Sequence, residues 1–304
     1  MANTDGTLVL GGAWLASQGI ASCRRAALLA LELGFSGVLP APTARRFPWH
    51  ELRTETEDLP FSMPAIRVAR PFEDAGQASL ASSRADDVLA VRERVERAAV
   101  LGRAIGVNVL VLEAPPLGLK LAQEERDEIA TALSVGRAPD PELRTRAMAA
   151  IEGRRDAGLE HACRNLHALL RQHPDFRFCL TESSDLGSLS GLDALEAILD
   201  DLASTRRLAY WHRASVVAWH GRSGGPEHGA VLECLSKYLR GMDLEDYGEH
   251  GPRSVPGSGL VDYGVLQPYS GRASERLACC LEPDPACRPD ELRHGRALLE
   301  KFDL

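Results

Sequence analysis

A repeated alternation of two hydrophobic patterns constrains the fold of this chain more than any other feature. Short apolar, β-branched runs end in polar residues, glycine or proline, and each is followed by a longer segment with helical periodicity. The runs predicted as strands are Thr7–Leu10, Phe35–Leu39, Met63–Ala69, Val107–Leu112, Phe176–Thr181, Leu208–His212, Gly241–Leu244 and Arg276–Leu281. Eight parallel strands joined by helices predict a closed α/β barrel, the (β/α)8 or TIM barrel.

The segments between these runs have the ends that helices need. Ser22 is a candidate N-cap for a helix over Arg24–Leu33, which stops at Gly34. Further helices are expected at Trp49–Asp58, Ala85–Gly106, Leu121–Val135, Leu143–Arg171, Leu192–Leu202, Gly224–Tyr238, Asp262–Tyr269 and Asp290–Phe302. No segment looks like a domain linker. We therefore predict a single domain over residues 1–304, with an elaborated helical connection at about 114–173.

An open, doubly wound sheet is the alternative fold, since it is built from the same alternation of strands and helices. Such a sheet usually carries a G-x-G-x-x-G turn after its first strand, where it binds a dinucleotide. Here only Gly11 and Gly12 follow the first strand. The barrel is therefore the favoured architecture.

Composition excludes several classes of partner. The formal net charge of −8 argues against nucleic acid, whose phosphates need clustered Lys and Arg. The longest apolar runs fall far short of the roughly 20 residues of a membrane span, and Met1–Asp5 lacks the pattern of a secretion signal. The seven cysteines are scattered and form no C-x-x-C pair, which favours reduced thiols. We expect a cytoplasmic protein with a small-molecule ligand, and its oligomeric state stays open.

The site of such a barrel is expected where its strands end, because catalytic groups come from the carboxyl ends of the strands. Acidic residues dominate these positions. Reading along the chain, the candidates are Trp14, Arg67, Arg70, Glu113, Glu182, His212, Arg213, Asp243, Glu245, Asp246 and Glu282. Arg67, Arg70 and Arg253 could hold a carboxylate or a phosphate, or could form ordinary salt bridges. Glu182 and Glu282 are the strongest, since an acid that terminates an apolar run points into the mouth of the barrel. We predict that these two glutamates face each other across the mouth, with Asp243 between them.

A family resemblance appears in the second half of the chain. The segments that carry it are FCLTE ending at Glu182, LAYWH ending at His212, GMDLED ending at Asp246, VPGSGLVD over Val255–Asp262, and CLEP over Cys280–Pro283. In this order they resemble the xylose isomerase-like barrels, which include sugar phosphate isomerases and epimerases and apurinic endonucleases. The resemblance covers most of the chain in layout and is specific over residues 178–283.

The resemblance implies a divalent metal held by four strand ends, with two glutamates that shuttle protons between adjacent carbons. Glu182 and Glu282 stand at the glutamate positions. The two other ligand positions depart from the pattern, because Arg213 replaces the usual aspartate after strand six and Asp243 replaces the usual histidine after strand seven. The metal site is therefore degenerate.

Two interpretations of this altered site follow. In one, a divalent Mn or Mg ion is held by Glu182, Asp243, Glu282 and His212, with Arg213 turned away. In the other, no metal binds, and Arg213 neutralises the three carboxylates, bridging at least one of them. The second interpretation is favoured because it explains both replacements together.

The expected function follows from these residues. Glu182 and Glu282 would act as acid and base in proton transfer on a small polar, sugar-like or keto substrate. The substrate would be bound by His212, Arg213, Asp243, Asp246, Trp14, Glu113 and Arg253. The alternative is a metal-free, degenerate barrel that binds a small molecule without catalysis, so whether the protein is an enzyme is left open at this point.

Overall fold

The structure of the chain is a computed structural model. It describes residues 7–42, 47–68, 78–117, 124–125, 128, 131–132, 140–185, 187–222, 225–248, 251–270 and 277–304.

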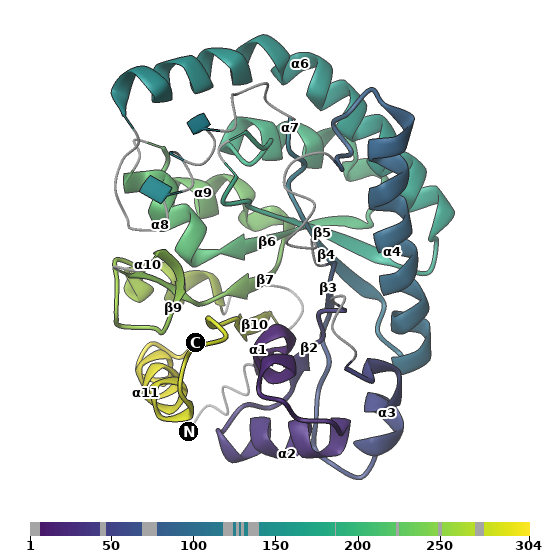
Figure 1. The fold of residues 1–304 in the computed structure, drawn as a ribbon, viewed down its shortest axis with the longest axis vertical. Coiled ribbons are helices and arrows are strands. Elements are labelled where there is room, and N and C mark those ends of the chain that lie inside the picture. Colours follow the sequence, from purple (N-terminus) through teal and green to yellow (C-terminus); the bar gives the residue numbers. More distant parts are fainter. Residues whose placement is uncertain are drawn as a thin grey trace.

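Eight parallel strands form one sheet that curves into a nearly closed barrel (Figure 1). They are β1 (Thr7–Gly11), β2 (Val38–Leu39), β3 (Ile66–Arg67), β4 (Val109–Glu113), β5 (Arg177–Thr181), β6 (Leu208–Arg213), β7 (Leu239–Asp243) and β10 (Ala278–Leu281). Their order in the sheet is β2-β1-β10-β7-β6-β5-β4-β3, and every neighbouring pair is parallel. The predicted eight-stranded parallel barrel is therefore confirmed.

Between β2 and β3 the barrel is closed by isolated backbone hydrogen bonds and not by a regular ladder. Val38 N donates to Ser62 O at 3.0 Å, and Arg67 N donates to Pro40 O at 2.9 Å. Both strands are only two residues long. The sequence had predicted longer strands here, over Phe35–Leu39 and Met63–Ala69. Pro40 and Pro64 have no N–H to donate, which limits how far a regular ladder can extend here.

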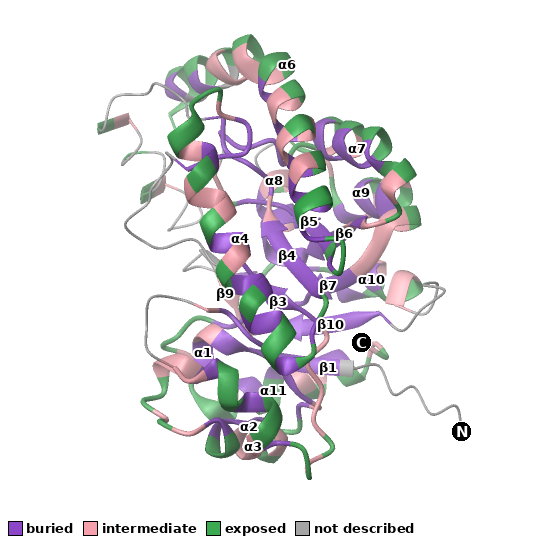
Figure 2. Ribbon diagram, turned by 90° about the vertical axis from the view of Figure 1, so that its right-hand side faces the viewer, coloured by how far each residue is buried: buried purple, intermediate pink, exposed green. Residues whose placement is uncertain are grey.

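Helices surround the barrel (Figure 1), and their inward faces are buried while their outward faces are exposed (Figure 2). They are α1 (Gly12–Ser17), α2 (Cys23–Glu32), α3 (Leu52–Glu55), α4 (Ala85–Ile105), α6 (Pro141–Gln172), α7 (Leu192–Asp201), α8 (Ala214–Arg222), α9 (His228–Leu235), α10 (Tyr263–Ser270) and α11 (Pro289–Glu300). Short 3-10 helices span Trp49–Glu51, Ala203–Thr205 and Ser236–Tyr238. None of the helices described in these ranges has the length and apolarity needed to cross a bilayer.

Local signals explain several helix ends. The Ser22 hydroxyl accepts the N–H of Arg25 at 3.2 Å, so Ser22 caps α2 as predicted. Asp140 caps α6 in the same way, with its carboxylate accepting the N–H of Glu142 at 2.9 Å. Helix α4 ends at Gly106, whose φ of 80° is a left-handed conformation that glycine adopts without strain.

Three elements were not predicted from the sequence. Helix α1 starts directly after β1, and α8 starts directly after β6, so no loop separates strand from helix. A two-stranded antiparallel hairpin, β8 (Asp246–Gly248) with β9 (Gly251–Ser254), occupies part of what was expected to be a loop. The helix predicted over Gly224–Tyr238 is shorter, and most of the helix predicted over Leu121–Val135 lies outside the described residues.

Candidate functional site

The interior of the barrel is layered, because alternate residues of each strand point toward the barrel axis. The lower layer is apolar and consists of Val9, Leu39, Ala65, Val109, Val111, Cys179, Trp211, Ala278 and Cys280. Two positions further along six of the strands stand the polar residues Arg67, Glu113, Thr181, Arg213, Asp243 and Glu282. Parallel strands share one direction, so these six residues form a polar layer at the carboxyl end of the barrel.

Arg67 is the cation that neutralises the carboxylates of the seventh and eighth barrel strands. Its Nη2 lies 2.6 Å from both carboxylate oxygens of Asp243, and its Nε lies 3.7 Å from Oε2 of Glu282. Trp211 also donates its indole N–H to Oδ1 of Asp243 at 2.8 Å. Burial alone would lower the pKa of Arg67, but Asp243 and Glu282 raise it above its ordinary value. The guanidinium is therefore a permanent charge in the polar layer.

Arg213 holds a second pair of carboxylates. Its Nε lies 3.0 Å from Oε1 of Glu245, and its Nη1 donates to Oε1 of Glu113 at 3.1 Å. The hydroxyl of Ser215 donates to the same Oε1 of Glu245 at 3.1 Å. Burial and the neighbouring Asp243 raise the pKa of Glu245, whereas Arg213 lowers it. Glu113 therefore lies in the polar layer, and Glu245 extends that layer. That Glu113 binds a substrate stays a prediction.

The predicted position of the Arg213 guanidinium is wrong. It was expected to bridge at least one of Glu182, Asp243 and Glu282, but Arg67 is the arginine that contacts the last two. Strand β3 lies opposite β7 in the order of the barrel, so Arg67 reaches across the axis to Asp243. Hydrophobic periodicity shows which residues point inward, but it does not show which inward residues meet across the barrel.

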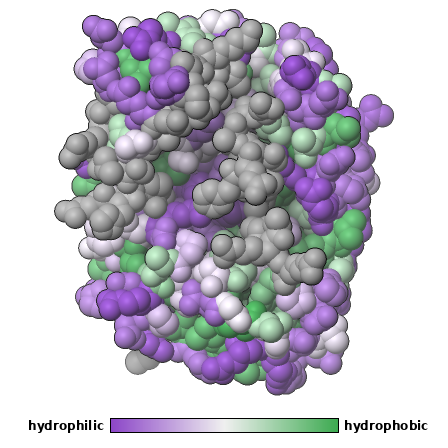
Figure 3. All heavy atoms as spheres, in the orientation of Figure 1, coloured by the Kyte–Doolittle hydropathy of each residue, from purple (hydrophilic) through white to green (hydrophobic). Residues whose placement is uncertain are grey.

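Several buried atoms of this layer have no hydrogen-bond partner among the described residues. They are Oε1 and Oε2 of Glu282, Oε2 of Glu245, Nε and Nη1 of Arg67, and Oγ1 of Thr181. Buried polar groups are normally hydrogen-bonded, so these atoms can accept from or donate to a polar ligand or water. The space-filling view, drawn in the orientation of Figure 1, shows hydrophilic surface, in purple, near the middle of the face toward the viewer (Figure 3).

Two glycines leave the space that these side chains occupy. A Cβ atom on Gly11 would lie 2.4 Å from Cδ of Glu282, and one on Gly241 would lie 2.3 Å from the Trp211 ring. The φ of Gly11 is −65°, which any residue can adopt, so its lack of a side chain is explained by the glutamate packed against it. Gly11 thus positions Glu282 and does more than end the first strand.

Glu182 lies outside the polar layer. It follows the inward-pointing Thr181 by one residue, and therefore points in the direction of Leu180, toward the helices. Its carboxyl group lines a small cavity with Leu195 of α7 and Val217 of α8. Sequence patterns alone did not reveal this direction, because the strand ends at Thr181 and the next residue was taken to face the mouth.

The prediction that Glu182 and Glu282 face each other across the mouth, with Asp243 between them, is therefore wrong for Glu182. Its Oε2 accepts the backbone N–H of Arg213 at 2.9 Å, and its Oε1 accepts the hydroxyl of Tyr210. Both contacts lie on the side of β6 that faces the helices. The acid pair expected from the resemblance is not assembled in the polar layer.

His212 belongs to the same outer network as Glu182. The Tyr210 hydroxyl lies 2.7 Å from Nδ1 of His212, and Nε2 of His212 lies 3.0 Å from Nδ1 of His228. Burial lowers the pKa of His212, and it lowers the pKa of His228 to about 4. Both imidazoles are therefore neutral near neutral pH. The structure places His212 away from the polar layer, with both of its ring nitrogens engaged.

The side chains present do not fit the metal site that the resemblance implies. The four proposed ligands fall into two groups, Glu182 with His212 toward the helices and Asp243 with Glu282 in the polar layer. The guanidinium of Arg67 contacts both oxygens of Asp243, where it would repel a divalent ion. In the part of the chain that the structure describes, no three His, Cys, Asp or Glu side chains are grouped to hold an ion. The absence of a bound metal stays a prediction.

Asp246 has a structural role that differs from the predicted binding role. Its Oδ1 accepts the backbone N–H groups of Tyr247 at 2.8 Å and Val261 at 2.9 Å. Its Oδ2 accepts those of Gly257 at 2.9 Å and Gly259 at 3.0 Å. Four donors occupy the carboxylate, so Asp246 shapes the loop that contains the P-G-x-G segment.

Replacing Asp246 with asparagine is expected to lower the free energy of unfolding by about 2 kcal/mol. The amide oxygen can still accept the buried N–H groups of Tyr247 and Val261, whereas those of Gly257 and Gly259 are exposed and can turn to water. Urea unfolding measures the loss. The control is Asp262→Asn, since exposed Asp262 accepts one N–H, from Gly264. Equal losses in the two variants would contradict this role of Asp246.

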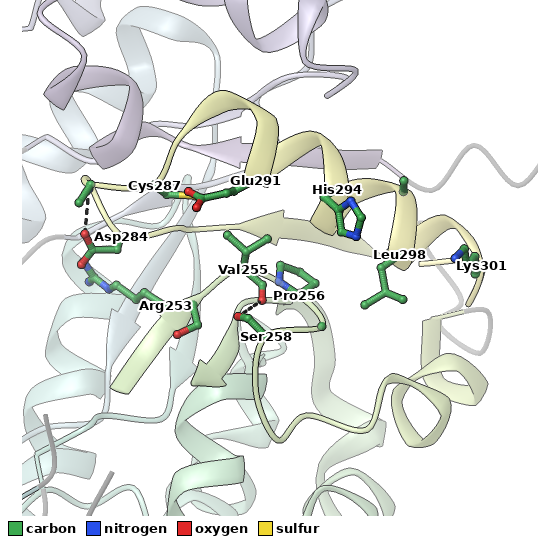
Figure 4. A pocket seen from close by; sticks show the side chains of 14 residues that line it. Arg253, Val255, Pro256, Ser258, Asp284, Cys287, Glu291, His294, Leu298 and Lys301 are labelled. Atoms are coloured by element: carbon green, nitrogen blue, oxygen red, sulfur yellow. Dashed lines mark hydrogen bonds between the residues drawn. The ribbon is translucent and has the colours of Figure 1, made fainter. Parts of the chain in front are cut away.

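The two remaining predicted ligand-binding residues lie elsewhere. Trp14 is fully buried in the outer core, and its indole N–H donates to the carbonyl of Cys287 at 2.9 Å. Arg253, on β9, lines a cavity outside the barrel (Figure 4), although its charge is near enough to Glu282 to lower that pKa. Neither residue is in the polar layer.

The polar layer also contains two strand-end candidates that were not included in the predicted acid–base and substrate-binding set. Arg67 was considered for holding an anionic group of a ligand, as was Arg70, which lies outside the described residues, and Glu245 was given no particular role. A signal for Arg67 was present, since it follows the inward-pointing Ala65 by two residues. Glu245 follows Asp243 by the same interval, beyond the end of β7.

Comparisons with known proteins identify similar folds among solved structures, but no match to a protein family or to a curated sequence. No family model matches the chain, and no curated protein sequence matches it. A D-tagatose 3-epimerase-like protein matches with a TM-score of 0.68 and 10% identity, over 97% of this chain and 96% of that one. A 3-keto-D-glucoside 4-epimerase from E. coli matches with a TM-score of 0.63 and 11% identity, over 97% and 99%. A xylose isomerase-like TIM barrel protein from Mycobacterium smegmatis, in complex with magnesium, matches with a TM-score of 0.59 and 15% identity, over 100% and 98%.

The architecture and these matches define the class of fold. This chain has the xylose isomerase-like TIM-barrel fold, as the motifs of its second half suggested. Similar structures include sugar epimerases, and one of them contains magnesium. At identities of 8–15% the likeness carries the fold alone.

Proposed function

We propose that this protein binds a small polar, sugar-like or keto molecule in the polar layer, and that Glu282 transfers a proton to and from it. The observation that carries the proposal is the state of the Glu282 carboxylate. It is buried, neither of its oxygens has a hydrogen-bond partner among the described residues, and it lies against Gly11 at the carboxyl end of the barrel. Active sites of this architecture lie at the same end.

The protonation chemistry of Glu282 supports this role. Burial raises its pKa, while Arg67 and Arg253 lower it. A carboxylate with a raised pKa is a stronger base than one in water, which favours its role as a proton acceptor. Glu245, whose Oε2 also lacks a partner, is the second carboxylate that we propose for the exchange.

Arg67 supplies the complementary group. Its Nε and Nη1 are buried and have no hydrogen-bond partner among the described residues. When Glu282 removes a proton from a carbon next to a carbonyl, the C–H electron pair moves toward the carbonyl oxygen, and an enolate forms. The N–H groups of Arg67 can donate to that oxygen and stabilise its charge. A proton delivered by a second carboxyl group, such as Glu245, to the other face of the same carbon completes an epimerisation. In an isomerisation the hydroxyl group on that carbon gives its proton to the enolate oxygen and becomes the new carbonyl, while the adjacent carbon is protonated.

Ligand binding without turnover is the second candidate function. The position of Glu182 favours it, because the pair of glutamates that the resemblance implies is not assembled. The similar structures described as epimerases support the catalytic proposal at the level of fold, and the altered site supports the binding proposal. The two differ in one measurable property, which is exchange of a substrate proton with solvent.

Replacing Glu282 with glutamine is expected to reduce proton exchange at least about 100-fold, with little change in stability. The measurement is deuterium incorporation next to the carbonyl, followed by NMR in D2O with a panel of ketoses and keto acids. Glu160→Gln is the matched control, because Glu160 is an exposed glutamate of α6 that pairs with Arg164. Exchange by that variant should equal that of the wild-type protein.

The same panel separates the two candidates. A ligand that raises the melting temperature of the wild-type protein without any deuterium uptake would reject catalysis and support the binding function. Exchange that survives Glu282→Gln but disappears in Glu182→Gln would reject the assignment of Glu282. Loss of both thermal stabilisation and exchange in Glu245→Gln would show that Glu245 binds the ligand.

A further inference from the structure

A separate cavity of about 720 Å³ lies outside the barrel, between the loop after β9 and helix α11 (Figure 4). No residue of the polar layer lines it. Its volume is in the range of cavities that hold small organic molecules, about 300–1,000 Å³. The lining residues used below are Arg253, Val255, Pro256, Asp284, Glu291, His294, Ala297, Leu298 and Lys301.

The walls of this cavity are held in place by close backbone packing. A Cβ atom on Gly295 of α11 would lie 2.5 Å from Val255, and one on Gly257 would lie 2.7 Å from Leu298. The helix and the loop therefore approach as closely as glycine allows. The carboxylate of Asp246 anchors the same loop by accepting the N–H of Gly257. The cavity is formed before any ligand arrives.

Three basic side chains line the cavity, and the charge of one of them, Arg253, also acts on Glu282 of the polar layer. Arg253, His294 and Lys301 have no side-chain hydrogen bond or ion pair with the rest of the described chain. Figure 4 shows Arg253 and Lys301 at opposite ends of the view, with His294 on the helix between them. An anionic group placed here would gain a charge-assisted hydrogen bond without breaking an existing one.

The acidic residues of the lining are already engaged. Both carboxylate oxygens of Glu291 accept from Arg288, at 2.7 Å from its backbone N and at 3.1 Å from Nη2. Oδ1 of Asp284 accepts the N–H of Ala286 at 2.8 Å. Glu291 is thus paired with Arg288, whereas Asp284 keeps its charge. Two cations, Arg253 and Lys301, therefore stand against one unpaired carboxylate in the lining.

The backbone of Arg253 is held in an unusual conformation. Its φ of 74° lies in the left-handed region, which residues other than glycine rarely adopt. Its carbonyl accepts the N–H of Asp284 at 3.0 Å, which ties the strand to the opposite wall of the cavity. Such conformations cluster at ligand-binding positions, because the surrounding structure must maintain them.

We propose that this cavity binds a small organic anion with an apolar body, such as an aromatic or alicyclic carboxylate, sulfonate or phosphate ester. Its anionic group pairs with the guanidinium of Arg253, which presents parallel N–H groups to such an acceptor. Its apolar body packs against Val255, Pro256, Ala297 and Leu298. The site is independent of the function proposed for the polar layer.

Two fluorescent probes with the same ring system test this proposal on the full-length protein. The anionic probe is 8-anilinonaphthalene-1-sulfonate, and the uncharged one is N-phenyl-1-naphthylamine. We expect saturable one-to-one binding of the anionic probe, weakened about tenfold or more in Arg253→Gln. The uncharged probe should bind Arg253→Gln and the wild-type protein equally. Ala297→Trp, which fills the cavity from an exposed position of α11, should abolish binding of both probes.

Matched variants make each outcome decisive. Arg293→Gln removes an arginine of α11 that pairs with Asp290 and does not line the cavity, so it should leave both titrations unchanged. Glu245→Gln should also leave them unchanged, because Glu245 belongs to the polar layer and the charges that act on it are those of Asp243, Arg213 and Arg67. The proposal is overturned if the wild-type protein shows no saturable binding, if Arg253→Gln binds the anionic probe as the wild type does, or if binding persists in Ala297→Trp with an unchanged melting temperature.

Discussion

Replacing Arg67 with methionine is expected to destabilise the folded protein by about 3–5 kcal/mol at neutral pH. Its guanidinium contacts both oxygens of Asp243 and lies 3.7 Å from Glu282, and all three residues are buried. Methionine fills much of the space but leaves two buried carboxylates without their counter-charge. Urea unfolding, followed by tryptophan fluorescence, measures the loss.

Arg24→Met is the matched control for this experiment. Arg24 makes an equally short pair with Asp58, with an N–O distance of 2.7 Å, but about half of each side chain is exposed to solvent. Exposed pairs contribute at most about 1 kcal/mol. Adding Asp243→Asn to Arg67→Met should recover part of the lost stability, since it removes one uncompensated charge. The assignment of Arg67 fails if its variant loses no more stability than Arg24→Met.

Replacing Glu182 with glutamine is expected to change the pH dependence of stability. Burial raises the pKa of Glu182 from 4.5 to about 7, against the opposing effect of the hydrogen bonds from Tyr210 and from the Arg213 backbone. Because the folded protein binds this proton more tightly than the unfolded chain, the stabilisation is complete below pH 4.5 and is lost as the pH rises toward 7. The size of the effect is about 3 kcal/mol.

Glutamine has the same shape and no charge, so the variant lacks this loss. Relative to the wild-type protein, Glu182→Gln should gain about 3 kcal/mol in free energy of unfolding between pH 4.5 and pH 8. The difference between the two proteins is the quantity to compare, because neighbouring histidines titrate in the opposite sense. Burial lowers the pKa of His212, so the stability linked to that residue is lost as the pH falls.

Denaturant unfolding at several pH values provides the measurement. Glu160→Gln is the control, as an exposed glutamate whose replacement should change stability by less than about 0.5 kcal/mol. A difference between Glu182→Gln and the wild type that stays constant from pH 4.5 to pH 8 would show that Glu182 ionises alike in the folded and unfolded chains. The hydrogen-bonded group of Glu182, Tyr210 and His212 would then have to be more hydrated than its buried position indicates.

The fold was accessible from the sequence because its signals are local. The apolar run of β5 and the helix cap at Ser22 each depend on residues within one turn or one strand. The repetition of such units leaves the barrel as the favoured closed arrangement. The elements that were missed, α1 and α8, begin at the residue after a strand ends, so no intervening loop separates the helix from the strand.

The contents of the candidate site were predicted in part, for a physical reason. A strand alternates its faces, so a residue two positions beyond an inward apolar residue also points inward, as Glu282 does beyond Cys280. Glu182 stands one position past the end of its strand, and a shift of one residue exchanges the barrel interior for the helix layer. A chemical resemblance at that position carries no information about the direction of its side chain.

The sequence alone determined that this chain folds as an eight-stranded α/β barrel with acidic residues at the strand ends. The tertiary structure alone decided that Arg67 pairs with Asp243 and Glu282, because β3 and β7 lie on opposite sides of the barrel. Hydrophobic periodicity depends on neighbours a few residues apart in the chain. Charge pairing depends on distances across the closed barrel, between residues separated by 176 positions in the sequence.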